Sequence, residues 1–253
     1  MRSAKRRVEL RTGQVRSYEG PPGNEVVASE GWAPFLSDLT ISRVVALALY
    51  NENVHPHYGR IETFDVSRVT NMKNVFRGRV SFDADLSNWD VSNVENMEGM
   101  FRGARSFKGR GLERWRVDKV RNMKCMFKAA FVFDADLSGW NVSNVENMSE
   151  MFENAASFRG VGVQNWVVSS VTRMRDMFNG AFLFNADLGN WDVSSVAEMS
   201  GMFQAAESFA GNGLQNWDVS NVETMSNMFS GATSLTFDLT QWPLRALLKI
   251  DGE

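Results

Sequence analysis

The sequence predicts an α/β solenoid in which each coil of 25 or 26 residues contributes one short parallel strand and one short helix. Tryptophan recurs at a fixed period, at positions 89, 115, 140, 166, 191, 217 and 242, and Phe64 stands one period before Trp89. Each of these aromatic residues except the last opens a phrase of the form W-x-V-x-x-V-x-x-M-x-x-M-F. A period of this length is typical of stacked repeats, which bury their apolar sides only against their neighbours.

The residues before the repeats divide into two segments. Residues 1–30 are polar and basic and show no periodicity, so they predict an arm without a core of its own. Residues 38–51 have the apolar spacing of an amphipathic helix, with Asp38 or Thr40 as its N-cap. A helix before a repeat array covers the open face of the first coil. Residues 31–60 are therefore predicted to form a helical N-terminal cap.

The repeats occupy residues 61–242 and form seven coils of two alternating kinds. The shorter coils carry F-[DN]-A-D-L before the next tryptophan, and the longer coils carry F-x-G-x-G-[LV]-x-x-W. The extra residue and the two glycines predict a bulge or a wider turn in the longer coils. Residues 84–89 and their equivalents are predicted to form the stacked parallel strands.

A helix is predicted to follow the strand in each coil. The apolar residues from Val94 to Ala104 recur at the spacing of one face of a helix of two to three turns. Capping boxes are predicted at the start of three of these helices, from Ser92 with Glu95, Ser143 with Glu146 and Ser220 with Glu223. The seven helices would begin near Val69, Val94, Val120, Val145, Val171, Val196 and Val222. Pro243, followed by LRALLKI, predicts a short C-terminal cap over residues 243–253.

The phrase DLSNWDVSNVENMEGMFRGARSF, repeated with variations from about Ile61 to Trp242, resembles the BspA-type leucine-rich-repeat surface proteins. It is similar to the repeat of that family first described in mycoplasma lipoproteins as a domain of unknown function. The segment from Tyr58 to Ser67 also resembles the entry into the family's first repeat. The resemblance implies a leucine-rich-repeat-like solenoid and a cell-surface or adhesin role, and it implies no catalytic residues.

Composition and local sequence exclude several kinds of site. Cys125 is the single cysteine, so the chain has no internal disulfide framework, and the residues at its place in other coils predict that it faces solvent. No apolar stretch reaches 18 residues, so no membrane span is expected. The N-terminus lacks the apolar region of a secretory signal, so we expect an intracellular or organellar protein. A cell-surface location is the alternative if a signal has been removed.

Three patterns could hold a metal ion, and each has a simpler interpretation. The paired methionines of the repeat suit a soft ion, but their spacing beside phenylalanine favours core packing. The Asp83/Asp85 pair and its equivalents lie two coils apart, about 10 Å, so turns or backbone hydrogen bonds are favoured over calcium. His55 and His57 lack a third ligand. No phosphate loop, nucleophile elbow or dinucleotide motif is present, so we expect no enzyme activity and no cofactor.

Charge divides the chain into two halves. Residues 1–128 carry 22 Lys and Arg against 15 Asp and Glu, a net charge of +7, whereas residues 129–253 carry 5 against 15, a net charge of −10. Basic residues gather in the early coils, at positions that are mostly neutral or acidic in later coils, so packing does not require their charge. The candidate partner-binding residues are Arg77, Arg79, Arg102, Arg105, Lys108, Arg110, Arg114, Arg116, Lys119 and Lys124.

The basic patch and the N-terminal arm predict docking on a protein with an acidic surface, within a larger assembly. A solvated face without a partner is the alternative. The tryptophans and phenylalanines are assigned to the core, so exposed aromatic residues do not accompany the charges, which argues against single-stranded nucleic acid. We therefore expect a non-catalytic protein-interaction scaffold or accessory subunit, with an extracellular adhesin-like protein as the alternative.

Overall fold

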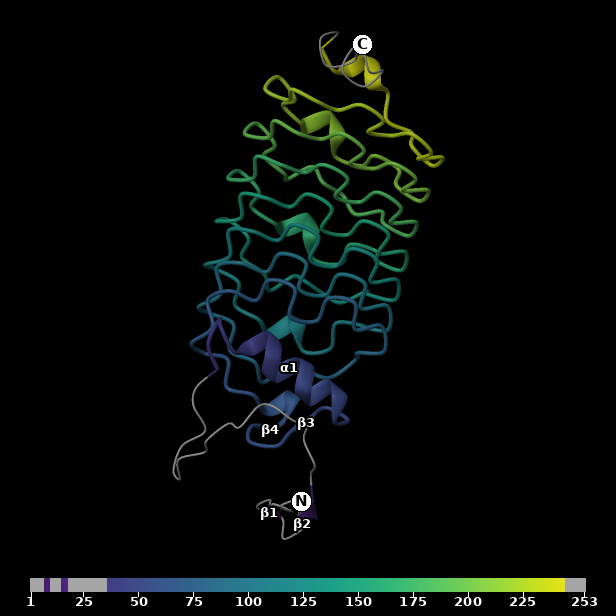
Figure 1. The fold of residues 1–253 in the computed structure, drawn as a ribbon. Helices are drawn as coiled ribbons and strands as arrows, with labels where there is room; N and C mark the ends of the chain where they lie inside the picture. Colours follow the sequence, from purple (N-terminus) through teal and green to yellow (C-terminus); the bar gives the residue numbers. More distant parts are fainter. Residues whose placement is uncertain (1–6, 10–14, 18–35, 244–253) are drawn as a thin grey trace.

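The structure, a computed structural model, describes residues 7–9, 15–17 and 36–243 (Figure 1). Of the predicted arm, it therefore describes only two short strands, β1 (Arg7–Glu9) and β2 (Val15–Ser17), which pair antiparallel. The predicted C-terminal cap, apart from Pro243, lies outside the described residues.

Successive coils lie one upon another along an elongated stack (Figure 1). We number the coils 1 to 7 by the aromatic residue that opens each: Phe64, Trp89, Trp115, Trp140, Trp166, Trp191 and Trp217. Isolated parallel bridges join neighbouring coils through one residue each: Asn71, Asn96, Asn122, Asn147, Arg173, Glu198 and Thr224. The ladder continues beside these bridges, since the N–H of Gly99 donates to the carbonyl of Lys124 at 2.8 Å and the N–H of Phe101 donates to that of Met126 at 2.9 Å.

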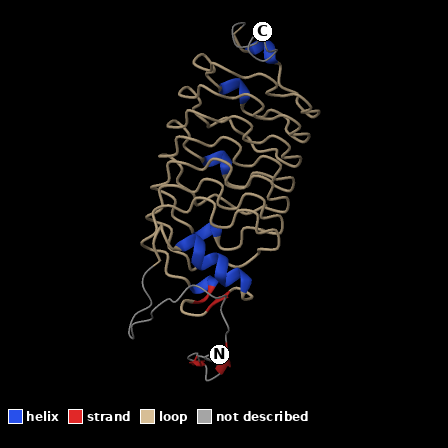
Figure 2. Ribbon diagram, viewed as in Figure 1, coloured by secondary structure: helices blue, strands red, loops and turns tan. Residues whose placement is uncertain are grey.

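The helix predicted for each coil is wrong. Figure 2 shows the coils drawn almost entirely as turns and loops, and this applies to the segments that follow Val69, Val94, Val120, Val145, Val171, Val196 and Val222. Gly99 has φ +61° and Gly103 has φ +71°, which a right-handed helix does not accommodate. Their N–H groups donate to the next coil instead of to a residue four positions earlier. Consecutive turns still bring Met97, Met100 and Phe101 inward, which reproduces the apolar spacing of a helix.

The predicted capping boxes and strands are also wrong. The N–H of Ser92 donates to Oδ1 of Asp90 at 3.0 Å, and the N–H of Ser220 donates to Oδ1 of Asp218 at 3.0 Å. Each serine therefore completes an Asx turn and caps no helix. The parallel pairing lies at Asn96 and its equivalents, after the segment 84–89 that was predicted to supply it. The strand was misplaced because Asx turns and strands share the same short polar and apolar alternation.

The longer coils accommodate their additional residue in a 3₁₀ turn. These turns are η2 (Leu112–Arg114), η3 (Val163–Asn165) and η4 (Leu214–Asn216), and similar turns, η1 (Ile61–Thr63) and η5 (Leu239–Gln241), stand near the two ends of the array. The residue before η3, Gly162, has φ +95°, a left-handed conformation that glycine adopts without steric cost. The wider turn predicted from the two glycines is therefore this glycine followed by one 3₁₀ turn.

The core is a set of aromatic and methionine rows that run the length of the stack. Rings of neighbouring coils stack in register, with Phe101 and Phe127 at 5.6 Å between ring centroids and Trp140 and Trp166 at 6.4 Å. The indole of each tryptophan in the repeats also donates a buried hydrogen bond to a carbonyl 28 or 29 residues earlier, as from Trp191 to Val163 at 2.8 Å. The paired methionines of coils 2 to 7 are fully buried, so the prediction that they pack the core is confirmed.

The first coil is covered by α1 (Ile41–Tyr50) and by a hairpin of β3 (Val54–His55) and β4 (Gly59–Arg60). Thr40 is the N-cap of α1, but its side chain makes no capping bond. The carboxylate of Asp38 instead accepts the N–H groups of Thr70 and Asn71, at 2.7 and 2.9 Å.

Asp38 supplies coil 1 with the hydrogen-bond acceptor that each later coil receives from the coil before it. In coil 2 the N–H groups equivalent to those of Thr70 and Asn71 belong to Glu95 and Asn96, and both donate to the carbonyl of Thr70. Asp38 Oδ1 supplies that acceptor to coil 1, where no preceding carbonyl exists. One side chain therefore satisfies the two donors that would otherwise be left open at the start of the ladder.

Replacing Asp38 with alanine is expected to destabilise the N-terminal end by about 1–2 kcal/mol, the usual cost of losing a side-chain cap. Burial alone would raise the pKa of Asp38, but the bonds from Thr70 and Asn71 outweigh it and hold the pKa below the ordinary value of 3.8. The unfolded chain therefore binds this proton more tightly, so the contribution of Asp38 is present above about pH 4 and is lost as the pH falls below it. Hydrogen exchange of the Thr70 and Asn71 amides would measure the loss, and Asp38→Asn, which keeps an acceptor oxygen, should lose less than Asp38→Ala.

Candidate functional site

The ten basic residues of the predicted patch lie around the perimeter of the early coils and do not share one face. Six of them contact acceptors within the chain: Lys108 and Arg110 contact Asp83 at 3.8 and 3.1 Å, Arg114 contacts Glu113 at 4.0 Å, Arg116 contacts Asp118 at 3.5 Å, Lys119 contacts Asn93 at 2.7 Å, and Lys124 contacts Glu150 at 3.7 Å. Each coil makes one full circuit of the stack, so basic residues that are close together in the sequence lie on different sides of it.

The structure brings together the remaining four, which we call the arginine cluster: Arg77, Arg79, Arg102 and Arg105. Coils 1 and 2 are joined at this point by two backbone bonds, from Gly78 to Arg102 at 2.7 Å and from Ser106 to Val80 at 3.0 Å. Arg102 is half-buried, and the other three arginines are exposed. Within the described part of the chain, none of the four forms an ion pair with a carboxylate.

The sign of the net charge changes one coil beyond the cluster, between coils 3 and 4. Lys128 of coil 3 forms ion pairs with Glu150 at 2.6 Å and with Glu153 at 2.5 Å, both from coil 4. Burial alone would raise the pKa of Glu150, but the hydrogen bond and charge of Lys128 lower it to about 2. Burial raises the pKa of Glu153. Lys128 is therefore neutralised within the chain, whereas the cluster before it is not.

Cys125 lies beside this pair and does not face solvent, so the prediction for it is wrong. Its side chain is 4% exposed, and its thiol donates to Glu150 Oε2 at 3.4 Å. Burial and the negative charge of Glu150 raise the pKa of the thiol to about 11. The position was misjudged because Glu150 and Asp176, which replace it in other coils, are charged but lie half-buried in ion pairs with Lys128 and Arg175. A protonated, buried thiol is a poor nucleophile and a poor metal ligand.

The paired aspartates serve the backbone. Asp83 Oδ1 accepts the N–H of Lys108 in the next coil at 3.0 Å, and Asp85 Oδ1 accepts the N–H of Ser87 at 2.9 Å. This is the hydrogen-bonding alternative that the sequence favoured over calcium. Among the described residues, no three His, Cys, Asp or Glu side chains are grouped so that they could hold a metal ion.

His55 is buried in the hairpin beneath coil 1. Its Nδ1 accepts the N–H of His57 at 3.1 Å and that of Tyr58 at 3.4 Å. Burial, together with the charge of His57, lowers the pKa of His55 to about 4, so the ring is neutral near pH 7. One ring nitrogen is therefore already used to shape the loop, which makes the histidine pair a structural feature.

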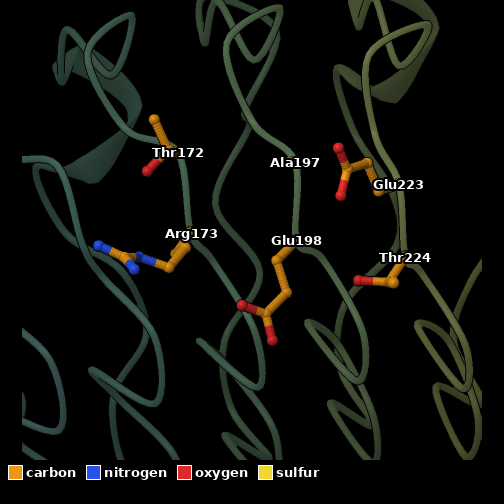
Figure 3. Close-up of a pocket in the computed structure, with 6 residues that line it drawn as sticks. All are labelled: Thr172, Arg173, Ala197, Glu198, Glu223 and Thr224. Carbon is orange, nitrogen blue, oxygen red and sulfur yellow. The ribbon is translucent and has the colours of Figure 1, made fainter.

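Two shallow hollows lie in the acidic half of the stack. Figure 3 shows the first, of about 460 Å³, whose lining comes from three neighbouring coils: Thr172, Arg173, Ala197, Glu198, Glu223 and Thr224. The second, of about 440 Å³, includes Asp187, Asn212 and Asp238. Both linings combine carboxylates with threonine hydroxyl groups.

Sequence reasoning missed a set of exposed apolar side chains, one of which contacts the arginine cluster. Phe131 is 36% exposed and Phe182 is 42% exposed, so the assignment of every phenylalanine to the core is wrong for these two. The guanidinium of Arg105 lies over the ring of Phe131, 5.3 Å from its centroid. A signal was available, because the same position carries alanine and glutamate in other coils, whereas the core positions vary little.

Comparison with known proteins identifies the repeat. A family model described as "Mycoplasma protein of unknown function, DUF285" matches residues 47–166 and residues 158–252. A search of curated proteins gave no match. In the described residues, no helix has both the length and the apolar character needed to cross a membrane.

Proposed function

This chain belongs to the DUF285 family, and we propose that it is a non-catalytic protein-interaction scaffold or accessory subunit that docks an acidic protein surface through its arginine cluster. In this proposal the stacked coils are a leucine-rich-repeat-like solenoid, a fold that presents extended surfaces to partners. The single observation that carries the proposal is that, within the described chain, none of the four neighbouring arginines forms an ion pair with a carboxylate.

The arginine cluster is not required for packing. The positions of Arg77 and Arg102 carry Glu153, Asn179 and Gln204 in later coils, and the ladder bonds continue through all of them. Four neighbouring guanidinium groups repel one another, and carboxylates of a partner would relieve that repulsion. Arginine binds carboxylates with two parallel hydrogen bonds, which gives such a contact geometric specificity.

An acidic protein fits the surface better than nucleic acid. A nucleic-acid site needs a basic track that follows several phosphates, whereas the charge here changes sign at the boundary of coils 3 and 4. Residues 129–253 carry a net charge of −10 and would repel a phosphate backbone that continued along the stack. A partner with a localised acidic patch avoids that repulsion.

The resemblance to BspA-type surface proteins supports a second candidate, an extracellular adhesin-like protein. Immunolabelling of intact and permeabilised cells distinguishes the two. Labelling of intact cells would favour the adhesin, and labelling only after permeabilisation would favour an internal scaffold.

Replacing all four cluster arginines with glutamine is expected to weaken association with the docked protein at least tenfold and to reduce its dependence on salt. The matched control replaces Lys108, Arg110, Arg114 and Arg116 with glutamine. It removes the same charge from the same part of the stack, but from residues that already have partners within the chain.

Quantitative affinity purification from the native source, followed by titration calorimetry with the recovered protein, measures the affinity of both variants. The affinity of a chain lacking residues 1–30 tests the predicted contribution of the arm. We expect the control to bind within twofold of the unmodified chain. Equal losses for the cluster and control variants, or full retention by the cluster variant, would overturn the proposal.

A further inference from the structure

We propose that the acidic surface bound by the arginine cluster is that of a second copy of this chain, which packs antiparallel along an exposed ridge of apolar and charged side chains. This inference rests on the proposed function, because it names the partner of the cluster. It is carried by three observations: the ridge itself, the reversal of charge along the stack, and the way both features match when the stack is turned end for end.

The ridge has one residue in each of coils 1 to 6: Val80, Arg105, Phe131, Ala156, Phe182 and Glu207. Val80 is 51% exposed, and Leu183 beside the ridge is 45% exposed. Backbone bonds hold neighbouring members together, from Ser157 to Phe131 and from Ser208 to Phe182, both at 3.1 Å. Three of its six members, Val80, Phe131 and Phe182, are exposed large apolar residues. Exposed apolar residues that gather beside polar ones are typical of a protein-interaction site.

The reversal of charge selects the direction of packing. Residues 36–128 carry 16 Lys and Arg against 11 Asp and Glu, whereas residues 129–243 carry 3 against 13. The coils follow one another along the stack (Figure 1), so one half of its length is basic and the other half is acidic. Two copies side by side in parallel would place like charges together, and antiparallel copies place unlike charges together.

A two-fold axis between coils 3 and 4 matches the ridge to itself. It places coil 3 against coil 4 of the second copy, coil 2 against coil 5, and coil 1 against coil 6, as a two-fold interface requires. Phe131 then faces the small side chain of Ala156, and Arg105 faces the exposed ring of Phe182, where a cation–π contact is favourable. Val80 faces Glu207, which brings a carboxylate next to Arg79 of the cluster. In a parallel pair, Arg105 would face Arg105.

The neighbouring row matches in the same way. It consists of Arg77, Arg102, Lys128, Glu153, Asn179 and Gln204, and carbonyls along it accept N–H groups from adjacent coils, as Lys128 does from Gly103 at 2.7 Å. The same axis places Lys128 opposite Glu153, Arg102 opposite Asn179, and Arg77 opposite Gln204. Lys128 and Glu153 already pair within each chain, and no cation of this row faces another cation, so the row is compatible with the same antiparallel register.

Sedimentation equilibrium of the full chain tests the proposal. We expect a reversible association from 28.5 kDa to twice that mass, weaker at high salt. Arg105→Glu should weaken the dimer at least tenfold, because it removes the contact with Phe182 twice. Phe182→Arg should do the same, because it places two pairs of arginines face to face. Val161→Glu, at a 46% exposed valine outside the ridge, is the matched control and should leave the dimer unchanged.

A mixture of the Arg105→Glu and Phe182→Arg variants gives the decisive result. In an antiparallel pair one contact then joins the introduced glutamate to the introduced arginine, and the other remains the original arginine on phenylalanine. The mixed dimer should therefore form although neither variant pairs with itself. A monomer at all concentrations, a dimer that survives in both variants, or a mixture that stays monomeric would overturn this inference. A monomer that still captures another acidic protein through the cluster would leave the proposed function standing, and loss of both would remove both.

Discussion

Replacing Trp166 with alanine is expected to lower the free energy of unfolding by about 3–5 kcal/mol, as for other large-to-small changes in a packed core. The side chain is 2% exposed and stacks between Trp140 and Trp191, at 6.4 Å from each. The substitution opens a cavity in the middle of the tryptophan row and leaves the carbonyl of Leu137 without its indole donor, which lies at 3.3 Å. Urea unfolding followed by circular dichroism measures the change.

The unfolding transition should also broaden in this variant, because each coil is stabilised only by its neighbours and a weak central contact uncouples the two halves. Trp166→Phe separates the two causes. It keeps an aromatic ring in the stack, as Phe64 does in coil 1, but removes the donor and part of the ring volume, so it should cost about 1–3 kcal/mol. A phenylalanine variant as unstable as the alanine variant would show that a stacked phenyl ring alone contributes little.

Replacing Gly162 with alanine is expected to cost about 3–5 kcal/mol, from left-handed strain and from overpacking together. Gly162 has φ +95°, and a Cβ atom there would lie 2.2 Å from the backbone nitrogen of Ser138 and 2.5 Å from the carbonyl carbon of Leu137. Both atoms belong to the backbone of coil 3, so no side-chain rotation relieves the contact and coils 3 and 4 must separate. Thermal unfolding by differential scanning calorimetry measures the loss.

Gly78→Ala is the matched control for this prediction. Gly78 also has a left-handed backbone, with φ +70°, but a Cβ atom there would meet nothing within 4 Å. It should therefore show the conformational cost alone, about 1–2 kcal/mol. Equal losses at the two positions would mean that backbone strain decides both and that the close approach of coils 3 and 4 contributes little.

The sequence by itself determined which residues form the core and where each coil begins. Trp140, Val145, Met148 and Phe152 and their equivalents were identified from their period, and they are buried in the structure except for the half-buried Phe229 of the last coil. Helix α1 lies within the segment predicted from apolar spacing. Such features are readable because burial repeats identically in every coil, so the pattern is reinforced seven times along the chain.

The local conformation of the coil depended on tertiary structure. The spacing of Met97, Met100 and Phe101 suits a helix as well as a series of turns, and the choice rests on whether Gly99 donates its N–H within the coil or to Lys124 of the next. Such ladders are satisfied together only when the coils stack. In the sequence of a single coil, the only sign of this stacking is that small or turn-forming residues are common at the positions with left-handed backbone.

Only the tertiary structure decided which surface residues meet. Ten basic residues close together in the sequence separate around the coil, and six of them find partners within the chain, so the arginine cluster emerges only after folding. Asp38 caps donors 32 and 33 residues away, and the ridge from Val80 to Glu207 draws its residues from six coils. Sequence periodicity records what every coil buries, whereas surface contacts depend on distances across the stack that no single repeat encodes.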